Sequence, residues 1–333
     1  MADLSSGESY CILNRMKIIV THNSPDMDAI TSVWLIKKFL PNWSEASIKF
    51  VPAGERLRGV NQESGIKNQG EDREKNHNSL FIIHDFVIER IGEDEVIHVD
   101  TGLGPLDHHQ TASDKVCGAS RTWDYIRIQN SEFRIQNDKI KSRIDAVSRM
   151  VKVVVDIDHF KEVFRKDPLS DYHEFDLAGI LDGLKLQFPN QDDYYVEFVS
   201  KSLDAVLHEF ENRIWAEKEI AQNGHEFATR FGKGIGFETI NDSVIKLAQK
   251  MGYAIVLRKD PRKGYVRIKA VPSDGKTNID LTLICEKLSK MDPDATWYLH
   301  ISKKMLLNGS VKNPKMRPSK LSLDQIIKVL EKV

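Results

Sequence analysis

The feature that most constrains the fold is a repeated change of pattern, from a short apolar run to a polar loop and then to helical spacing. Residues 17–20 are apolar and largely β-branched, and residues 22–25 are polar. Apolar residues then recur at helical spacing from Ile30 to Phe39, and Pro41 ends the pattern. Further strands are predicted over 47–51, 80–83 and 95–99, with a long exposed loop over 61–79. Strands that alternate with helices predict an α/β fold with a mostly parallel sheet flanked by helices.

The rest of the chain predicts a second, smaller α/β domain. Helices are expected from an N-cap at Ser120 and over 139–159, 175–186 and 193–222, the last long enough to bridge two domains. Later strands are expected over 253–257, 265–269 and 297–300, with a turn over 258–263, a closing helix over 322–333, and the glycine-rich run 232–236 as loop punctuation. With 333 residues, we expect an N-terminal extension over 1–15, a first domain over 16–190, a linker helix over 191–224 and a second domain over 225–333.

Composition excludes several classes of protein. The formal net charge is −1, so nucleic-acid binding would need a local basic patch. Cys11, Cys117 and Cys285 lie far apart without CxxC spacing, which argues against a disulfide framework or a zinc–thiolate site. No apolar run approaches a membrane span, and the first residues lack a signal-peptide pattern. We therefore expect a cytoplasmic protein without membrane partners. The sequence leaves the oligomeric state open.

Acidic and imidazole side chains follow the first predicted strand. His22, Asp26 and Asp28 lie in the turn that leads into the first helix, and Pro25 fixes the backbone before Asp26. Asp26 and Asp28 point in different directions, so they can serve two ions, or one ion and a neighbouring ligand. Hard oxygen ligands with imidazole favour Mn²⁺ or Mg²⁺ over a metal that prefers thiolates. The alternative is that Asp26 is simply the N-cap of the helix.

A second cluster follows the predicted strand at 95–99. Asp100 lies at the end of this strand, and Asp107, His108 and His109 come shortly afterwards. Alone, Asp100 is as compatible with an ordinary turn, and the two histidines with a solvated loop. Carboxyl ends of parallel strands meet at one edge of a sheet, however, and a two-metal site needs a bridging carboxylate with ligands from several strand ends. Together, these residues predict a two-metal centre.

These motifs resemble the DHH phosphoesterase superfamily. The stretch from His22 to Ser32 is similar to its first motif, and Val99-Asp-Thr-Gly102 with Leu106-Asp-His-His-Gln110 is closer still to the melanocyte-proliferating-gene (MYG) exonuclease family of metal-dependent hydrolases. The resemblance covers most of the chain in outline, while only the first three motifs are specific.

The resemblance implies a role for each residue. One Mn²⁺ would be held by His22, Asp26 and Asp100, and the other by Asp28, Asp100, His108 and a later aspartate, with Asp100 bridging. His109 would face the scissile phosphate as a charge stabiliser or proton donor, and Asp107 would orient the histidine pair. For the later aspartate, Asp158 is preferred, then Asp156 and then Asp182, although the Asn-Gly of the MYG motif is missing after Asp158.

The C-terminal part carries the expected phosphate-binding residues. An Asn308-Gly309 pair stands where the resembling domains have a Gly-Gly turn against the substrate, and glycine permits close approach to an anion. His300, Lys303 and Arg317 complete the set. A basic run surrounds them, and its alternative interpretation is a solvated surface: Lys303, Lys304, Lys312, Lys315, Arg317 and Lys320.

The sequence therefore favours a manganese-dependent phosphoesterase, of exonuclease type, that hydrolyses phosphodiester bonds of short oligonucleotides or nucleotides by a two-metal mechanism. Two alternatives stay open. One is a small-molecule phosphatase, such as a pyrophosphatase. The other is a non-enzymatic protein that binds nucleotides or a partner on the same scaffold, although the complete set of candidate ligands speaks against it.

Overall fold

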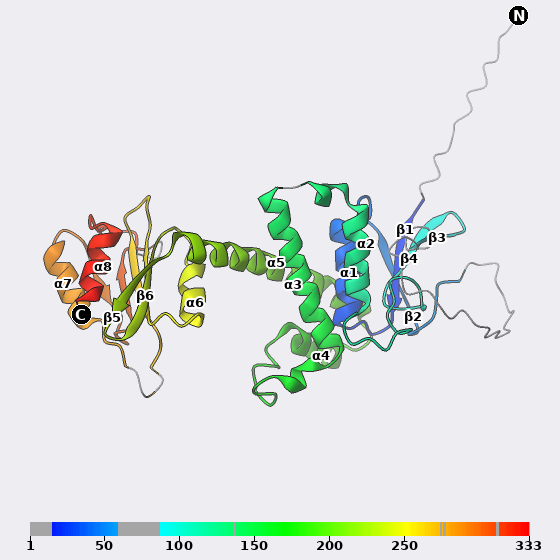
Figure 1. Cartoon of the computed structure of the whole chain (residues 1–333). Helices are drawn as coiled ribbons and strands as arrows, with labels where there is room; N and C mark the ends of the chain where they lie inside the picture. The colour runs from blue at the N-terminus through cyan, green and yellow to red at the C-terminus, as the bar shows by residue number, and fades with distance from the viewer. Residues whose placement is uncertain are drawn as a thin grey trace, which may run out of the picture. The chain divides into compact units, whose positions relative to one another are not determined.

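The computed structural model describes residues 15–58, 87–135, 137–273, 275, 278–310 and 313–332. The chain divides into two compact units, Met1–Phe210 and Glu211–Val333 (Figure 1). Cys11, the predicted loop over 61–79, the predicted strand over 80–83 and nearly all of the N-terminal extension lie outside the described residues. Among the helices that are described, none is both long and apolar enough to cross a membrane.

The first unit is built on a sheet with the strand order β2-β1-β4-β3. β1 (Lys17–His22) pairs in parallel with β2 (Ser47–Val51) and with β4 (Asp94–His98). β3 (Ile88–Ile91) adds an antiparallel edge. The predicted α/β class with a mostly parallel sheet is confirmed for this unit. β3 was not predicted, because it is a short strand in which exposed and half-buried residues alternate, without an apolar run.

Three helices pack together beside this sheet (Figure 1). They are α1 (Met27–Phe39), α2 (Gly118–Gln129) and α3 (Asp138–Asp158). The rings of Trp34, Phe39, Trp123 and Phe133 meet with centroids 5.3–5.9 Å apart. The amide of Asn130 donates to the carbonyl of Phe39 over 2.8 Å, so the C-terminal end of α2 is tied to the end of α1.

The α2 helix begins earlier than the sequence suggested. Cys117 is its N-cap, and Ser120 lies inside the first turn. The Ser120 hydroxyl accepts from the Cys117 N–H over 2.9 Å and donates to the Cys117 carbonyl over 2.8 Å. The predicted N-cap at Ser120 is therefore wrong by three residues, because this serine closes the turn from its third position instead of opening it.

Shorter elements and one long helix complete the first unit. They are the 3₁₀ turns η1 (Ser131–Arg134) and η2 (Lys161–Phe164), then α4 (Leu177–Gln187) and α5 (Asp192–Asn223). Asp204 on α5 accepts from the Trp34 indole over 2.9 Å and from Lys38 over 2.6 Å, so the first part of α5 is anchored to α1. α5 crosses the boundary between the two units and covers the helix predicted over 193–222.

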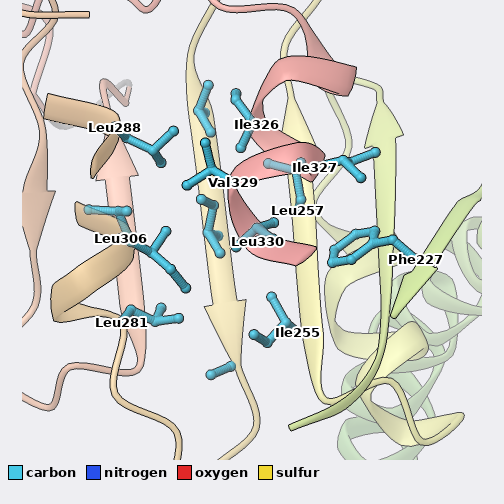
Figure 2. Close-up of a cluster of buried hydrophobic side chains, with 14 of the residues drawn as sticks. Phe227, Ile255, Leu257, Leu281, Leu288, Leu306, Ile326, Ile327, Val329 and Leu330 are labelled. Atoms are coloured by element: carbon cyan, nitrogen blue, oxygen red, sulfur yellow. The ribbon is translucent and has the colours of Figure 1, made fainter. Parts of the chain in front are cut away.

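The second unit holds a sheet with the order β5-β6-β7-β8-β10-β9, in which only β6 and β7 run parallel. Its strands are β5 (His225–Thr229), β6 (Gly232–Glu238), β7 (Ile255–Lys259), β8 (Val266–Ala270), β9 (Tyr298–Leu299) and β10 (Met305–Asn308). Its helices are α6 (Ser243–Lys250), α7 (Thr282–Met291) and α8 (Leu323–Glu331). Figure 2 shows α8 laying Ile326, Ile327 and Leu330 over Ile255 and Leu257 of the sheet.

The glycine-rich run 232–236 is a strand and not loop punctuation. It forms most of β6, where Gly234 lies opposite Phe227. A Cβ at Gly234 would come within 2.2 Å of the Phe227 ring, so glycine is what allows the ring to lie flat across the strand. Glycines required by contacts with a distant aromatic ring carry no local signal of a strand, which explains the wrong prediction.

Candidate metal centre

The predicted ligands from three motifs meet beside the ends of β1 and β4. Within the described residues, three groups of side chains place their ligand atoms within 4.8 Å of one another. They are His22 with Asp26 and Asp100, then Asp100 with His108 and His109, and finally His108 with Asp158 and His159. Donor atoms around one ion, each ~2.1 Å from it, lie ~3–3.5 Å apart, so these groups can hold metal ions.

Asp100 stands at the centre of the cluster. Its Oδ2 lies 3.3 Å from His22 Nε2, and its Oδ1 lies 3.5 Å from His108 Nε2. The side chain is 2% exposed, and Oδ1 has no hydrogen-bond partner among the described residues. Burial, with the added repulsion of Asp26, Asp158 and Asp107, raises the pKa of Asp100 to about 9. Burial of a negatively charged carboxylate without a partner is unfavourable, and a cation would supply the compensating positive charge.

The backbone around Asp100 is specialised. Asp100 has φ +51°, in the left-handed region that few residues other than glycine adopt. Its N–H donates to the Leu106 carbonyl over 3.1 Å, and the Asp107 N–H donates to Gly104 over 3.2 Å. These two bonds fold residues 100–107 into a compact loop, so that Asp100 and the histidine pair face the same space.

His22 presents one nitrogen to the cluster. Its Nδ1 lies 2.9 Å from the carbonyl of Asn23, which can only accept a hydrogen bond, so Nδ1 carries the proton. Nε2 is therefore free to bind a cation, and it faces Asp100 and, at 3.9 Å, Asp26 Oδ2. An imidazole whose second nitrogen donates to a carbonyl is the usual arrangement of a metal-binding histidine.

Asp26 is both an N-cap and a member of the cluster. Its Oδ1 accepts from the N–H groups of Asp28 and Ala29 over 2.9 and 3.0 Å, which caps α1. Its Oδ2 is the atom that faces His22. Capping and ligation were alternatives in the sequence, and the structure makes them compatible, because only one of the two oxygens is used for the cap.

Asp28 is buried and holds the start of α2. Its Oδ2 accepts from the Gly118 N–H over 2.6 Å, and its Oδ1 accepts from Ala119 over 2.7 Å. Burial and the charge of Asp100 raise the pKa of Asp28. Oδ2 also lies 3.7 Å from His108 Nε2, at the edge of the cluster. Gly118 was not predicted, yet a Cβ there would come within 2.9 Å of Asp100 and 3.0 Å of Asp28.

The two histidines of the motif have different surroundings. His108 is nearly buried, and burial lowers its pKa in spite of the neighbouring Asp158 carboxylate, so the neutral imidazole that binds cations is favoured. The His109 side chain is 58% exposed, and its Nδ1 lies 2.7 Å from Asp107 Oδ1. The buried Asp107 also accepts from the backbone of His109 and Leu103, and against the effect of burial these bonds lower its pKa. The hydrogen bonds of Asp107 thus hold the ring and the backbone of His109.

Among the three candidates for the later aspartate, Asp158 lies in the cluster. Its Oδ2 is 3.6 Å from His108 Nε2 and has no hydrogen-bond partner among the described residues. Burial raises its pKa, although His108 counteracts this. Asp156 faces away toward Lys161, at 3.7 Å, and Asp182 is exposed on α4. The structure does not bring either alternative to the cluster.

His159 belongs to the cluster but was not singled out in the sequence. Its Nε2 lies 2.9 Å from the carbonyl of Val116 and 3.6 Å from Asp158 Oδ2. Lys161 donates to the carbonyl of Asp114 over 2.6 Å. These two bonds tie the end of α3 to the loop before α2. The sequence offered one signal for His159, its position directly after Asp158.

The predicted phosphate-binding residues of the second unit form two groups at opposite ends of β10. His300 and Lys303 precede the strand, where Lys303 pairs with Asp280 at 3.0 Å. Asn308 and Gly309 lie at its other end, beside Arg317. The Asn308 amide donates to the carbonyls of Thr296 and Arg317 over 2.8 and 2.9 Å, so its donor is already used in the fold.

The local structure explains why position 309 is a glycine. Gly309 has φ +83°, and a Cβ would come within 2.2 Å of the Tyr265 ring. The glycine thus makes room for an aromatic side chain, which differs from the predicted approach to an anion. Lys320 pairs with Asp294 at 3.5 Å, while the side chain of Lys312 lies outside the described residues. In the second basic run, 258–263, only part forms the predicted turn: Arg258 and Lys259 are the last residues of β7, and the turn to β8 follows them.

Comparison with known proteins gives a distant similarity of structure and no match of sequence. No protein-family model and no curated protein matches the chain. A solved structure described as a member of a family of ribosomal proteins, with a DHH domain, is similar over 95% of this chain and 86% of its own. The two share 13% sequence identity, with a TM-score of 0.30. A likeness of this degree does not assign the chain to a family, so the site must be interpreted from its own geometry.

Proposed function

We propose that this protein is a metal-dependent phosphoesterase that uses two divalent cations. The observation that carries the proposal is the placement of Asp100. Its two carboxylate oxygens face two different imidazole nitrogens, His22 Nε2 and His108 Nε2, at 3.3 and 3.5 Å. A carboxylate between two nitrogen ligands is what a pair of bridged ions requires.

The side chains divide into two ligand sets around Asp100. His22, Asp26 and Asp100 would hold one ion, and Asp100, His108, Asp158 and Asp28 the other. The buried oxygens Asp100 Oδ1 and Asp158 Oδ2 lack hydrogen-bond partners within the described residues, and a cation satisfies such atoms. Oxygen and imidazole ligands without a thiolate favour Mn²⁺, and Mg²⁺ second. When bound, such ions lower the pKa of water and neutralise charge on a phosphate group.

His109 is the residue we assign to the phosphate group. Asp107 receives its Nδ1–H at 2.7 Å, which fixes the ring and leaves Nε2 for a substrate atom. The ring is more than half exposed, while Asp107 is buried, so the donor is accessible and its support is rigid. In its protonated form, His109 would donate from Nε2 to a phosphate oxygen or to the leaving oxygen.

All of these residues lie in the first unit, which we therefore propose as the catalytic domain, within residues 16–190. We propose short oligonucleotides or nucleotides as substrates, gripped by the basic residues of 225–333, with 191–224 as the linker. In that region, Lys315 and Arg317 have no ion pair with a described residue. Cys117 and Cys285 are free thiols, which suits our proposal of a cytoplasmic, reducing location.

A small-molecule phosphatase, such as a pyrophosphatase, is the second candidate. It is favoured by the pairing of Lys303 with Asp280 and of Lys320 with Asp294, which reduces the positive charge available to a nucleic-acid strand. A protein that binds a nucleotide without hydrolysing it would lack activity on every substrate but could still bind Mn²⁺.

The decisive experiment is a screen with Mn²⁺ or Mg²⁺ against pyrophosphate, dinucleotides and end-labelled oligonucleotides. We expect Mn²⁺-dependent hydrolysis of the dinucleotide or oligonucleotide, and loss of activity in Asp100→Ala and His108→Ala. Asp182→Ala is the matched control, because this exposed aspartate lies on α4 away from the cluster. Full activity of Asp100→Ala would falsify the bridging role, and hydrolysis of pyrophosphate alone would favour the second candidate.

A further inference from the structure

The first unit contains a pocket that is separate from the metal-centre residues. Its volume is about 530 Å³, within the range of ~300–1,000 Å³ that is typical of small-molecule sites. It lies between α2, η1, α3 and the loop that carries the histidine motif. None of the candidate metal ligands lines it. The lining residues are Pro105, Arg121, Asp124, Tyr125, Arg127, Ile128, Phe133 and Ile144.

The walls of this pocket are largely apolar, and one of them packs against the aromatic core. Pro105, Ile128, Phe133 and Ile144 provide hydrocarbon surface from four different segments. The Phe133 ring packs at 5.9 Å from Phe39 and at 5.3 Å from Trp123, measured between centroids, so it is held in place by the aromatic core. A fixed apolar wall suits a flat ring more than a flexible polar chain.

One charged group in this pocket has no partner among the described residues. Arg121 Nε is buried and makes no hydrogen bond to any of them, and no described carboxylate lies within ion-pair distance of the Arg121 side chain. The neighbouring Asp124 is largely exposed and lies 4.0 Å from Arg127, so its charge has another partner. Burial of a guanidinium N–H without an acceptor is unfavourable. Arg121 therefore brings a positive charge without a described partner to the pocket lining, and an anionic group on a ligand would pair with that charge.

The pocket walls belong to the elements that hold the candidate metal ligands. Pro105 lies between Gly104 and Leu106, whose carbonyls accept the N–H groups of Asp107 and Asp100 over 3.2 and 3.1 Å. Arg121, on α2, follows the helix start whose N–H groups bind Asp28. A ligand that shifts Pro105 or α2 would therefore move the carboxylates of the cluster.

We propose that this pocket is a regulatory site for an organic anion with a flat apolar body. The anionic group pairs with Arg121, and the apolar body lies against Ile128, Phe133 and Ile144. Binding of the anion does not depend on the proposed hydrolysis. Only its effect on the metal centre rests on the proposed function, and this effect is measured as a change in Mn²⁺ affinity.

Naphthalene-2-sulfonate is a suitable probe, because it combines a flat ring system with one negative charge. Isothermal titration of the full chain should show saturable binding of one probe per chain. Arg121→Gln should weaken it about 10- to 100-fold, as expected for the loss of a charge-assisted hydrogen bond. Lys141→Gln removes the same charge from an exposed position on α3 outside the pocket and should bind the probe like the parent chain.

Two further measurements test the anion and the pocket separately. Neutral 2-naphthol should bind more weakly than the sulfonate and should not respond to Arg121→Gln. Ile144→Trp should weaken binding, because the larger side chain narrows the pocket, and an unchanged melting temperature would show that this variant folds. If either Arg121→Gln or Ile144→Trp binds the sulfonate as tightly as the parent chain does, the proposed site is wrong.

The regulatory effect is tested by titrating Mn²⁺ with and without saturating naphthalene-2-sulfonate. We expect the Mn²⁺ dissociation constant to change at least about fivefold, and Mn²⁺ to change the probe affinity by the same factor, because the coupling is reciprocal. Unchanged Mn²⁺ affinity would refute regulation. A chain that binds no Mn²⁺ at all would refute the proposed function together with regulation, while the probe titration would still decide on the binding site.

Discussion

Gly118→Ala tests the geometry of the candidate metal centre most directly. A Cβ at this position would come within 2.9 Å of the Asp100 Cβ, 3.0 Å of Asp28 Oδ2 and 3.2 Å of Asp100 Oδ1. Carbon atoms in contact usually lie ~3.5–4.0 Å apart, so α2 or the two aspartates must move by about half an ångström or more. Such overpacking costs about 1–3 kcal/mol.

The assay has two parts. The melting temperature of the metal-free protein should fall by about 2–4 °C for each kcal/mol lost, given the size of the first unit. Mn²⁺ affinity, measured by calorimetry, should fall at least about tenfold, because the displaced Asp100 and Asp28 belong to the ligand sets. A displaced carboxylate changes binding even where the fold survives.

Gly183→Ala is the matched control. Gly183 also lies in a helix, α4, but a Cβ there meets no atom within 4 Å. Alanine should therefore stabilise the protein by about 0.5–1 kcal/mol through helix propensity, without any effect on Mn²⁺. If Gly118→Ala melts like the parent chain and binds Mn²⁺ equally well, the close approach of α2 to the two aspartates is wrong.

Three further predictions concern protons and charges. Burial and Arg56 lower the pKa of His98 to about 4. The contribution of neutral His98 to the free energy of unfolding should therefore be fully present above pH 6.5. It should fall by at most about 3 kcal/mol as the pH drops to 4. Urea unfolding against pH checks this, and an equal slope in His98→Asn would contradict it. Because the pKa of Asp100 is about 9 without a cation, Mn²⁺ binding at pH 7 should release a proton. Calorimetry in buffers of different ionisation enthalpy measures that proton, and fewer protons per bound Mn²⁺ should be released in Asp100→Asn. Asp158→Asn should weaken Mn²⁺ binding by tenfold or more, whereas Asp182→Asn should leave it unchanged; equal effects would refute the choice of Asp158.

Local pattern was sufficient for the segment from β1 through α1 to β2. The strand over 47–51 is found as predicted, and the first helix ends at Phe39, just before Pro41. The second unit was harder, because β5, β6 and β10 and the helices α6 and α7 are short or glycine-rich. Their stability comes from packing across the sheet, as between Phe227 and Gly234, which periodicity along the chain does not record.

In the candidate site too, local pattern predicts some residues, while others depend on three-dimensional packing. His22, Asp26, Asp100 and His108 could be selected because strand ends bring carboxylates and imidazoles together. Asp158 could be ranked but not fixed, since only the packing of α3 separates it from Asp156, two residues away on another side of the helix. Gly118 and His159 needed the three-dimensional structure, because their contacts join segments distant in sequence.

The division of Asp26 between two tasks affects how related sequences should be compared. Because one of its oxygens caps α1, an aspartate at this position would be kept for stability even in a relative without the proposed metal site. The same holds for Asp28, which anchors α2. The His108 side chain caps no helix and anchors none; three carboxylates surround its Nε2 instead. Replacement of His108 is therefore the better sign that a relative has given up metal chemistry, and persistence of Asp26 or Asp28 says little.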